Sequence, residues 1–202
     1  MAERKSRVDA VRNREAVLAA ADALFARRES PEDVTMADVA AAAGVGKGTL
    51  FRAFGDRAGL LRALYQARLE PISRAVDSGP PPLGPAALPE QRALALLDAL
   101  LCFKIDNRRL TVALEESGSS SPYQAEHYER WHGLLRSVLE QIPGLTNSDF
   151  TAHALLAATR ADLVEHLTGQ ERVSRDGLRA QLADFTTRVL GTGSPREAAA
   201  AD

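Results

Sequence analysis

The sequence predicts an all-α protein of nine helices with no strands. Alanine and leucine dominate the composition, and no run of alternating apolar and polar residues extends beyond a few positions. Apolar residues recur instead at the three- and four-residue spacing of an α-helix. With 202 residues, 45% of them hydrophobic, the chain is long enough to bury a sizeable core.

The first two predicted helices have recognisable ends. The first, 13–28, ends before Pro31, because proline lacks a backbone donor and restricts the residue that precedes it. Thr35 is expected to cap the second helix, with Asp38 three residues later as in a capping box. Gly44 ends this short helix.

The rest of the chain is also predicted to be helical. A stretch rich in proline and glycine, 77–89, is expected to be a loop at or just beyond a domain boundary. Ser148 and Ser174 are expected to cap the last two helices. The seven further helices are predicted at 46–55, from 57 onward, and at 89–107, 108–117, 123–141, 148–168 and 174–190.

Charge is distributed unevenly along the chain. Residues 1–70 carry 12 Lys and Arg against 10 Asp and Glu, whereas residues 71–202 carry 13 against 17. The net charge of −2 excludes a uniformly basic, histone-like protein. The basic residues near the N-terminus, among them Arg4, Lys5, Arg7 and Arg14, indicate that any contact with a polyanion occurs at that end. An ordinary solvated surface would explain the same charges.

Several classes of site and location are disfavoured by the sequence. The single cysteine, Cys102, forms no intrachain disulfide, and no window reaches the roughly 18 apolar residues of a membrane span. We therefore expect a cytoplasmic protein that does not enter a membrane.

The sequence contains no recognisable metal or cofactor motif. His127 and His132 are five residues apart and do not share a helical face, and no phosphate-loop or dinucleotide motif is present. We expect no metal, no cofactor and no enzyme activity.

The segment 35–54, TMADVAAAAGVGKGTLFRAF, has the sequence pattern of a helix-turn-helix. Small alanines at 40–43 allow two short helices to pack closely, while Leu50 and Phe54 anchor the second helix. A helical hairpin in a protein that does not bind DNA would have similar spacing. The opposite face of the second helix presents Gly46, Lys47, Gly48, Thr49 and Arg52.

These residue types suit contact with the DNA major groove. Gly46 and Gly48 have no side chain to obstruct close approach of the backbone. Lys47 is able to reach a guanine edge or a phosphate, and Thr49 a phosphate or a thymine methyl group. The N-terminus of the second helix adds N–H groups and a positive dipole that attract phosphate.

The longer segment 35–61 resembles the N-terminal signature of the TetR-type transcriptional regulators, T-x-x-x-I-A-x-x-A-G-V-S-x-G-T-L-Y-x-H-F-x-x-K-x-x-L. Val39 conservatively replaces the isoleucine of that pattern. Four further departures affect individual phosphate contacts: Gly46 replaces Ser, Phe51 replaces Tyr, Ala53 replaces His and Arg57 replaces Lys. The matching residues are Thr35, Ala40, Ala43, Gly44, Val45, Gly48, Thr49, Leu50, Phe54 and Leu60.

The resemblance implies a nine-helix fold and a homodimeric, ligand-responsive transcriptional regulator. It further implies a repressor that binds a palindromic operator in double-stranded DNA and is released by a small-molecule effector. The high alanine and arginine content is typical of a GC-rich bacterial genome. The implied parts are a DNA-binding domain at 1–55, a ligand-binding and dimerisation domain at 56–190, and a disordered tail at 191–202. The implied DNA contacts are Thr35, Gly46, Lys47, Gly48, Thr49, Phe51, Arg52 and Arg57.

The second part of the chain carries the implied dimer interface and ligand pocket. The interface residues are Leu156, Leu163, Leu167, Leu178, Leu182, Phe185 and Val189. By periodicity alone, these stripes would pack equally well on their own chain. The pocket residues are Phe103, Tyr128, Trp131 and His132, although aromatic residues at such positions also fill cores. The alternative function is a helical small-molecule-binding protein or enzyme that does not bind DNA, against which the 35–54 motif argues.

Overall fold

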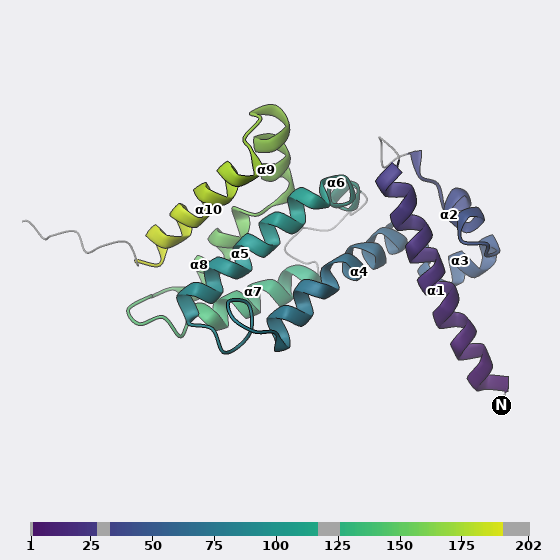
Figure 1. The fold of residues 1–202 in the computed structure, drawn as a ribbon, viewed down its shortest axis with the longest axis horizontal. Coiled ribbons are helices and arrows are strands. Elements are labelled where there is room, and N and C mark those ends of the chain that lie inside the picture. The colour runs from purple at the N-terminus through teal and green to yellow at the C-terminus, as the bar shows by residue number, and fades with distance from the viewer. Residues whose placement is uncertain (1, 28–32, 117–125, 192–202) are drawn as a thin grey trace, which may run out of the picture. The chain divides into compact units, whose positions relative to one another are not determined.

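The computed structural model describes residues 2–27, 33–116 and 126–191, and these residues form helices and no strands. The predicted all-α fold is confirmed (Figure 1). The helices are α1 (Ala2–Arg27), α2 (Met36–Ala42), α3 (Lys47–Phe54), α4 (Arg57–Ser78), α5 (Pro89–Asp106), α6 (Arg108–Glu116), α7 (Glu126–Leu139), α8 (Ser148–Ala157), α9 (Ala161–Glu165), the π-helical η3 (His166–Gln170) and α10 (Arg175–Val189).

The chain folds as two compact units. The first comprises Met1–Pro71 and Asn107–Ser120, and the second comprises Ile72–Asp106 and Ser121–Asp202. Helix α4 therefore begins in the first unit and ends in the second. The functional division predicted after residue 55 stays a prediction, because these units are defined by packing alone. Residues 192–202 of the predicted disordered tail lie outside the described residues, as does Pro31.

Helix α1 starts earlier than predicted. It begins at Ala2, whereas the apolar repeat placed its start at residue 13. Residues 2–12 lack a continuous apolar stripe, but they are rich in alanine, arginine, lysine and glutamate, which favour helix intrinsically. Periodicity detects only the part of a helix that packs against a core, so it missed the first turns.

The helix predicted over 148–168 is divided in the structure. Helix α8 ends at Ala157, where the buried hydroxyl of Thr159 donates to the Leu156 carbonyl at 2.9 Å. Arg160 then adopts an extended conformation, with φ −65° and ψ 144°, before α9 begins. The predicted cap at Ser148 is also wrong. Asn147 precedes the helix in the left-handed region at φ 58°, and Ser148 is already helical.

The core of the first unit joins α1 to the two short helices. Helix α1 packs on α2, and α2 packs on α3. The buried side chains come from one face of each helix, as the apolar spacing predicted. They include Val17, Ala21 and Phe25 of α1, Val39 and Ala40 of α2, Leu50 and Phe54 of α3, and Leu60, Leu61 and Leu64 of α4.

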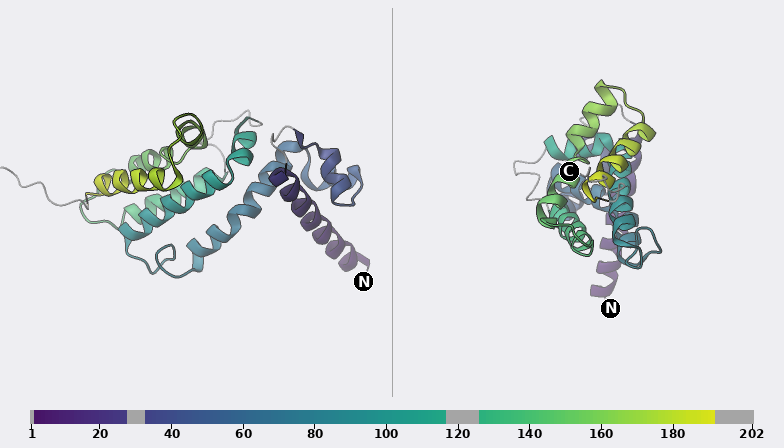
Figure 2. Two further views of the ribbon diagram at one scale, coloured as in Figure 1. Left: turned by 45° about the horizontal axis from the view of Figure 1, so that its top comes forward. Right: turned by 90° about the vertical axis from the view of Figure 1, so that its left-hand side faces the viewer.

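The second unit is organised around α5. This helix packs against α7, α9 and α10, and α7 packs against α8. Figures 1 and 2 show α10 running alongside α5. Two ion pairs join these helices, between Arg175 and Asp106 and between Arg179 and Asp98, where Nε lies 2.7 Å from Oδ1. Among the described residues, no helix is long and apolar enough to cross a membrane.

The first prediction concerns stability in acid. Burial, with a smaller contribution from the charge of Lys104, lowers the pKa of His127 from 6.5 to about 4. In the unfolded chain His127 is protonated near pH 6.5, whereas in the folded chain it is protonated only near pH 4. Between these two pH values the unfolded chain binds more protons, so the free energy of unfolding falls as the pH is lowered. The variant His127→Gln should lose less stability between pH 7.5 and pH 5, measured by urea unfolding. An unchanged pH dependence in His127→Gln would contradict the assignment.

Candidate DNA-binding site

A capping box fixes the start of α2. The Thr35 hydroxyl accepts a hydrogen bond from the Asp38 amide at 3.2 Å, and the Asp38 carboxylate accepts one from the Thr35 amide at 3.1 Å. The predicted box is thus confirmed. Because two amides that lack helical partners are satisfied reciprocally, α2 begins at a single defined residue.

The turn between α2 and α3 is a Schellman motif. Gly44 adopts a left-handed conformation at φ +66°, its amide donates to Ala41, and the Val45 amide donates to Ala40 at 3.0 Å. Nothing lies within 4 Å of the position that a Cβ of Gly44 would occupy. Glycine is therefore required for its backbone conformation and not for space.

Gly46 begins the second helix in an extended conformation, with φ −68° and ψ 144°, and supplies no side-chain cap. The Thr49 and Leu50 amides both donate to its carbonyl. The first amides of α3 are thus not covered by a capping side chain, unlike those of α2. An uncapped helix N-terminus is suited to bind an anion such as a phosphate.

Helix α3 has one buried face and one exposed face. Leu50 is fully buried and Phe54 is 8% exposed, whereas Phe51 on the outer side is 49% exposed. The structure therefore brings the predicted contacts on and beside α3 to the surface. These exposed residues are Gly46, Lys47, Gly48, Thr49, Phe51 and Arg52.

Arg14 of α1 contacts the C-terminal end of α3. Its Nη1 donates to the Ala53 carbonyl at 3.3 Å, and its guanidinium lies 4.6 Å from the centroid of the Phe54 ring. A cation at the C-terminus of a helix is stabilised by the helix dipole, and the aromatic face adds attraction. In the sequence, Arg14 is only one of a group of basic residues near the N-terminus. A separation of 39 residues gave no signal of this contact.

Thr35 and Arg57 flank the predicted interface and differ in burial. Thr35 is exposed, and its hydroxyl donates to Asp38 Oδ2 at 2.7 Å within the capping box. Arg57 is half-buried, and its Nε lies 3.5 Å from the Val34 carbonyl, to which it donates. The start of α4 is thereby tied to the residue before the cap of α2.

The four predicted pocket residues differ in burial. Phe103 and Trp131 are 5% and 3% exposed and belong to the core, and the Trp131 Nε1 has no hydrogen-bond partner among the described residues. Tyr128 and His132 are half-buried on α7, where their rings stack with 6.0 Å between centroids.

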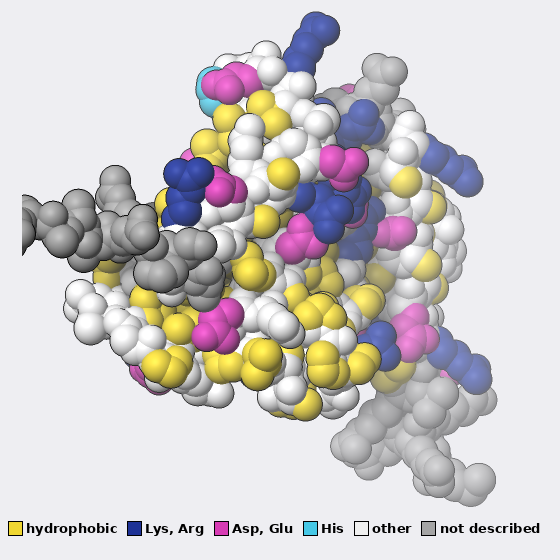
Figure 3. All heavy atoms as spheres, turned by 60° about the vertical axis from the view of Figure 1, so that its left-hand side comes forward, with side chains coloured by type: hydrophobic (Ala, Val, Ile, Leu, Met, Phe, Trp, Pro, Cys, Tyr) yellow, Lys and Arg dark blue, Asp and Glu magenta, His cyan; other side chains and the backbone are white. Residues whose placement is uncertain are grey.

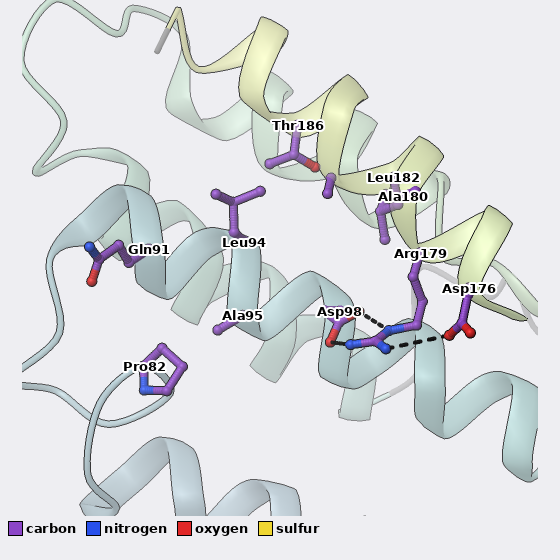
Figure 4. A pocket seen from close by; sticks show the side chains of 11 residues that line it. Pro82, Gln91, Leu94, Ala95, Asp98, Asp176, Arg179, Ala180, Leu182 and Thr186 are labelled. Carbon is purple, nitrogen blue, oxygen red and sulfur yellow. Dashed lines mark hydrogen bonds and ion pairs between the residues drawn. The ribbon is translucent and has the colours of Figure 1, made fainter. Parts of the chain in front are cut away.

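A groove of about 660 Å³ lies elsewhere, between α5, α10 and the loop that contains Pro82. In Figure 4 the Asp98 and Arg179 side chains face each other across it. None of the predicted pocket residues is among those lining this groove.

The predicted dimer stripe is divided between core and surface. Leu156, Leu178 and Leu182 are buried within their own unit. Leu163 and Phe185 are 38% and 42% exposed. Leu167 and Val189 are half-buried. Exposed hydrophobic side chains are visible beside acidic and basic ones in Figure 3.

The two short helices and the exposed face of α3 define a helix-turn-helix protein of the DNA-binding class. Residues 17–64 match the family model for bacterial regulatory proteins of the tetR family. The N-terminal part of the chain therefore has the sequence and the local structure of a tetR-family helix-turn-helix domain.

The similarity to known proteins extends over nearly the whole chain. The HTH-type transcriptional regulator SAR0097 of Staphylococcus aureus (strain MRSA252) is 24% identical over 192 residues, which is 91% of this chain and 96% of the relative. A TetR-family transcriptional regulator from Rhodococcus sp. has a similar structure, with a TM-score of 0.64, 21% identity, and coverage of 88% of this chain and 98% of that one. NalD, the secondary repressor of the MexAB-OprM multidrug efflux pump in Pseudomonas aeruginosa, has a TM-score of 0.56 and 22% identity, over 90% of this chain and 96% of NalD.

The second prediction compares two glycines of the helix-turn-helix. Gly44→Ala should lower the free energy of unfolding by about 1–2 kcal/mol, because a residue with a Cβ is strained in the left-handed region. Gly48 lies inside α3 at an ordinary φ, and an added Cβ would meet nothing within 4 Å. Gly48→Ala should therefore raise stability by up to about 1 kcal/mol. Urea unfolding of both variants measures the difference, and shifts of the same sign would contradict the assigned turn.

Proposed function

We propose that the chain is a homodimeric repressor that inserts α3 into the major groove of a palindromic operator and releases it when a small molecule binds. The observation that carries this proposal is the division of α3 into a face anchored by Leu50 and Phe54 and a face that is exposed. A recognition helix needs both faces, because it must be held rigidly while its outer side chains contact base edges.

Each exposed residue of α3 has a role in this proposal. Lys47 reads a guanine edge, Thr49 contacts a phosphate or a thymine methyl group, and Arg52 grips the backbone. Gly48 admits close approach, because no atom stands where its side chain would be. The uncapped amides after Gly46 bind a phosphate together with the helix dipole.

Flanking residues extend the contact to the phosphate backbone. Thr35 and Arg57 lie at the starts of α2 and α4, where exposed or half-exposed polar groups meet the two sides of a groove. Phe51 packs against sugar atoms, since it lacks the hydroxyl of the tyrosine common in the family. The basic residues Arg4, Lys5 and Arg7 lie on α1 and add nonspecific attraction.

A dimer explains the palindromic operator. Two copies related by a two-fold axis present two α3 helices, which suit half-sites about 34–36 Å apart, one helical turn of DNA. Phe185 and Leu163 are the exposed members of the predicted interface, so they are the residues that a second copy would cover.

Release follows from the affinity of the effector for one arrangement of the dimer. A small molecule in the second unit favours a dimer whose α3 helices no longer match adjacent major grooves, and its effect is limited by its differential affinity for the two states. The half-buried Tyr128 and His132 and the groove between α5 and α10 supply polar groups beside apolar surface. The repressor NalD supports repression as the direction of control. The proposed location is the cytoplasm, where a bacterial operator is accessible.

The third prediction tests base reading by Lys47. Lys47→Ala should weaken binding to the preferred duplex by about 1–3 kcal/mol and relax the preference at one base pair in each half-site. Fluorescence anisotropy on a panel of duplexes with single base-pair changes measures both effects. Arg74→Ala removes an exposed cation near the end of α4 and should bind the panel as the wild type does. Equal weakening on every duplex would make Lys47 a phosphate contact instead.

The fourth prediction concerns the dimer. Phe185→Asp places a charge on an exposed apolar position and should yield monomers in sedimentation velocity, with the helical content unchanged. Leu182 is a poorer probe, because it is buried within its own unit and its replacement would destabilise the fold. Leu88→Asp, at a 62% exposed position before α5, is the control and should stay dimeric. A Phe185→Asp protein that remains a dimer would exclude Phe185 from the interface.

A further inference from the structure

Three potential metal ligands converge between α7 and α8 in the second unit. His132 Nε2 lies 3.5 Å from Asp149 Oδ1, and His153 Nε2 lies 4.0 Å from Asp149 Oδ2. One ligand atom from each residue lies within 4.8 Å of the other two. His132 and His153 are 21 positions apart in the sequence and on different helices, so no short motif announces the cluster.

The distances are close to those of a transition-metal site. Zn²⁺ binds histidine nitrogen and carboxylate oxygen at about 2.0–2.2 Å, so neighbouring ligand atoms in a tetrahedral site stand roughly 3.3–3.5 Å apart. The separation between His132 and Asp149 already has this value, and that between His153 and Asp149 is 4.0 Å. The Asp149 and His153 side chains are 63% and 42% exposed, which gives them room to adjust and leaves positions for water.

The two imidazole rings must turn apart to bind one ion. Their centroids are 3.8 Å apart and their planes are inclined by 20°, so the rings stack face to face. A metal ion is bound in the plane of each ring, along the nitrogen lone pair. The ring that turns is that of His132, because the hydrogen bond with Tyr128 holds the ring of His153 in place.

A neighbouring hydroxyl fixes the orientation of His153. The Tyr128 hydroxyl lies within hydrogen-bond distance of His153 Nδ1. When Nδ1 carries the proton and donates to this oxygen, the lone pair of Nε2 faces Asp149 and is available for a metal. Arg136 acts in the opposite direction, because its Nη1 lies 3.6 Å from Asp149 Oδ1 and its charge competes with a cation.

We propose that His132, Asp149 and His153 bind one first-row transition-metal dication, of which Zn²⁺ is the representative. Two imidazole nitrogens with one carboxylate favour such an ion over Mg²⁺ or Ca²⁺, which prefer oxygen ligands. Tyr128 is a positioning residue that acts through His153. The ion bridges α7 and the first turns of α8. The sequence-based expectation of no metal considered His127 with His132, and His127 is not part of this site.

The proposal is tested on the full chain without an affinity tag, after treatment with a chelator and dialysis. Titration with Zn²⁺ by calorimetry and with Co²⁺ by visible absorption should show one equivalent bound per chain, with the strong absorption of four-coordinate Co²⁺. The ligand variants Asp149→Asn and His153→Gln should each weaken binding at least about tenfold, and Tyr128→Phe by about 10–100-fold. Arg136→Ala should strengthen binding, because it removes the competing cation.

A matched control separates this cluster from other surface histidines. His166 is exposed on η3 beside Gln170 and Glu171, and His166→Gln should bind both ions as the wild type does. Circular dichroism melts establish that each variant is folded. The proposal is overturned if neither ion binds stoichiometrically, or if Asp149→Asn and His153→Gln bind as tightly as the wild type. Loss of the site in His166→Gln would also overturn it. The titrations involve no DNA, so their outcome is independent of the proposed repressor function.

Discussion

The turn at Gly44 is the constraint on which the DNA-binding unit depends. Its left-handed backbone, at φ +66°, closes the Schellman motif at the end of α2 and sets the direction in which α3 starts. Leu50 then packs into the same core as Val39, so α3 has a fixed rotation about its own axis. Because Leu50 and Phe54 occupy the inner face, the outer face is available for a partner.

Contacts between residues far apart in the sequence hold α3 on α1 and α1 on α4. Arg14 of α1 contacts the C-terminal end of α3, and Arg68 of α4 lies 2.6 Å from Asp22 of α1 and donates to Asn107 at 2.7 Å. These pairs are partly exposed, so each contributes little to stability. Their value is geometric, because they orient α3 on helices that are themselves packed. A recognition helix requires such support, since small displacements weaken hydrogen bonds to base edges.

The features that could be predicted from the sequence are those set by residues close together in the chain. The capping box at Thr35, the glycine at 44 and the apolar spacing of α3 all lie within 20 residues, and the structure has each of them as expected. The break after α8 was missed, because the residue pattern is helical on both sides of it and only the backbone of Arg160 is extended. The cluster of His132, Asp149 and His153 and the contact of Arg14 depend on tertiary packing that spacing does not encode. Periodicity identified the stripe on α10, but only the fold shows which of its members stay exposed.

Selection of the purified chain against a random double-stranded DNA library, at two salt concentrations, tests the central claim most directly. The account predicts enrichment of a palindrome whose half-site centres are about 10–10.5 base pairs, or a multiple of this, apart. It also predicts nonspecific retention that falls as salt rises, while the enriched sequence persists. A folded dimer, first freed of bound small molecules by extraction, that enriches no sequence at either salt concentration would contradict the account.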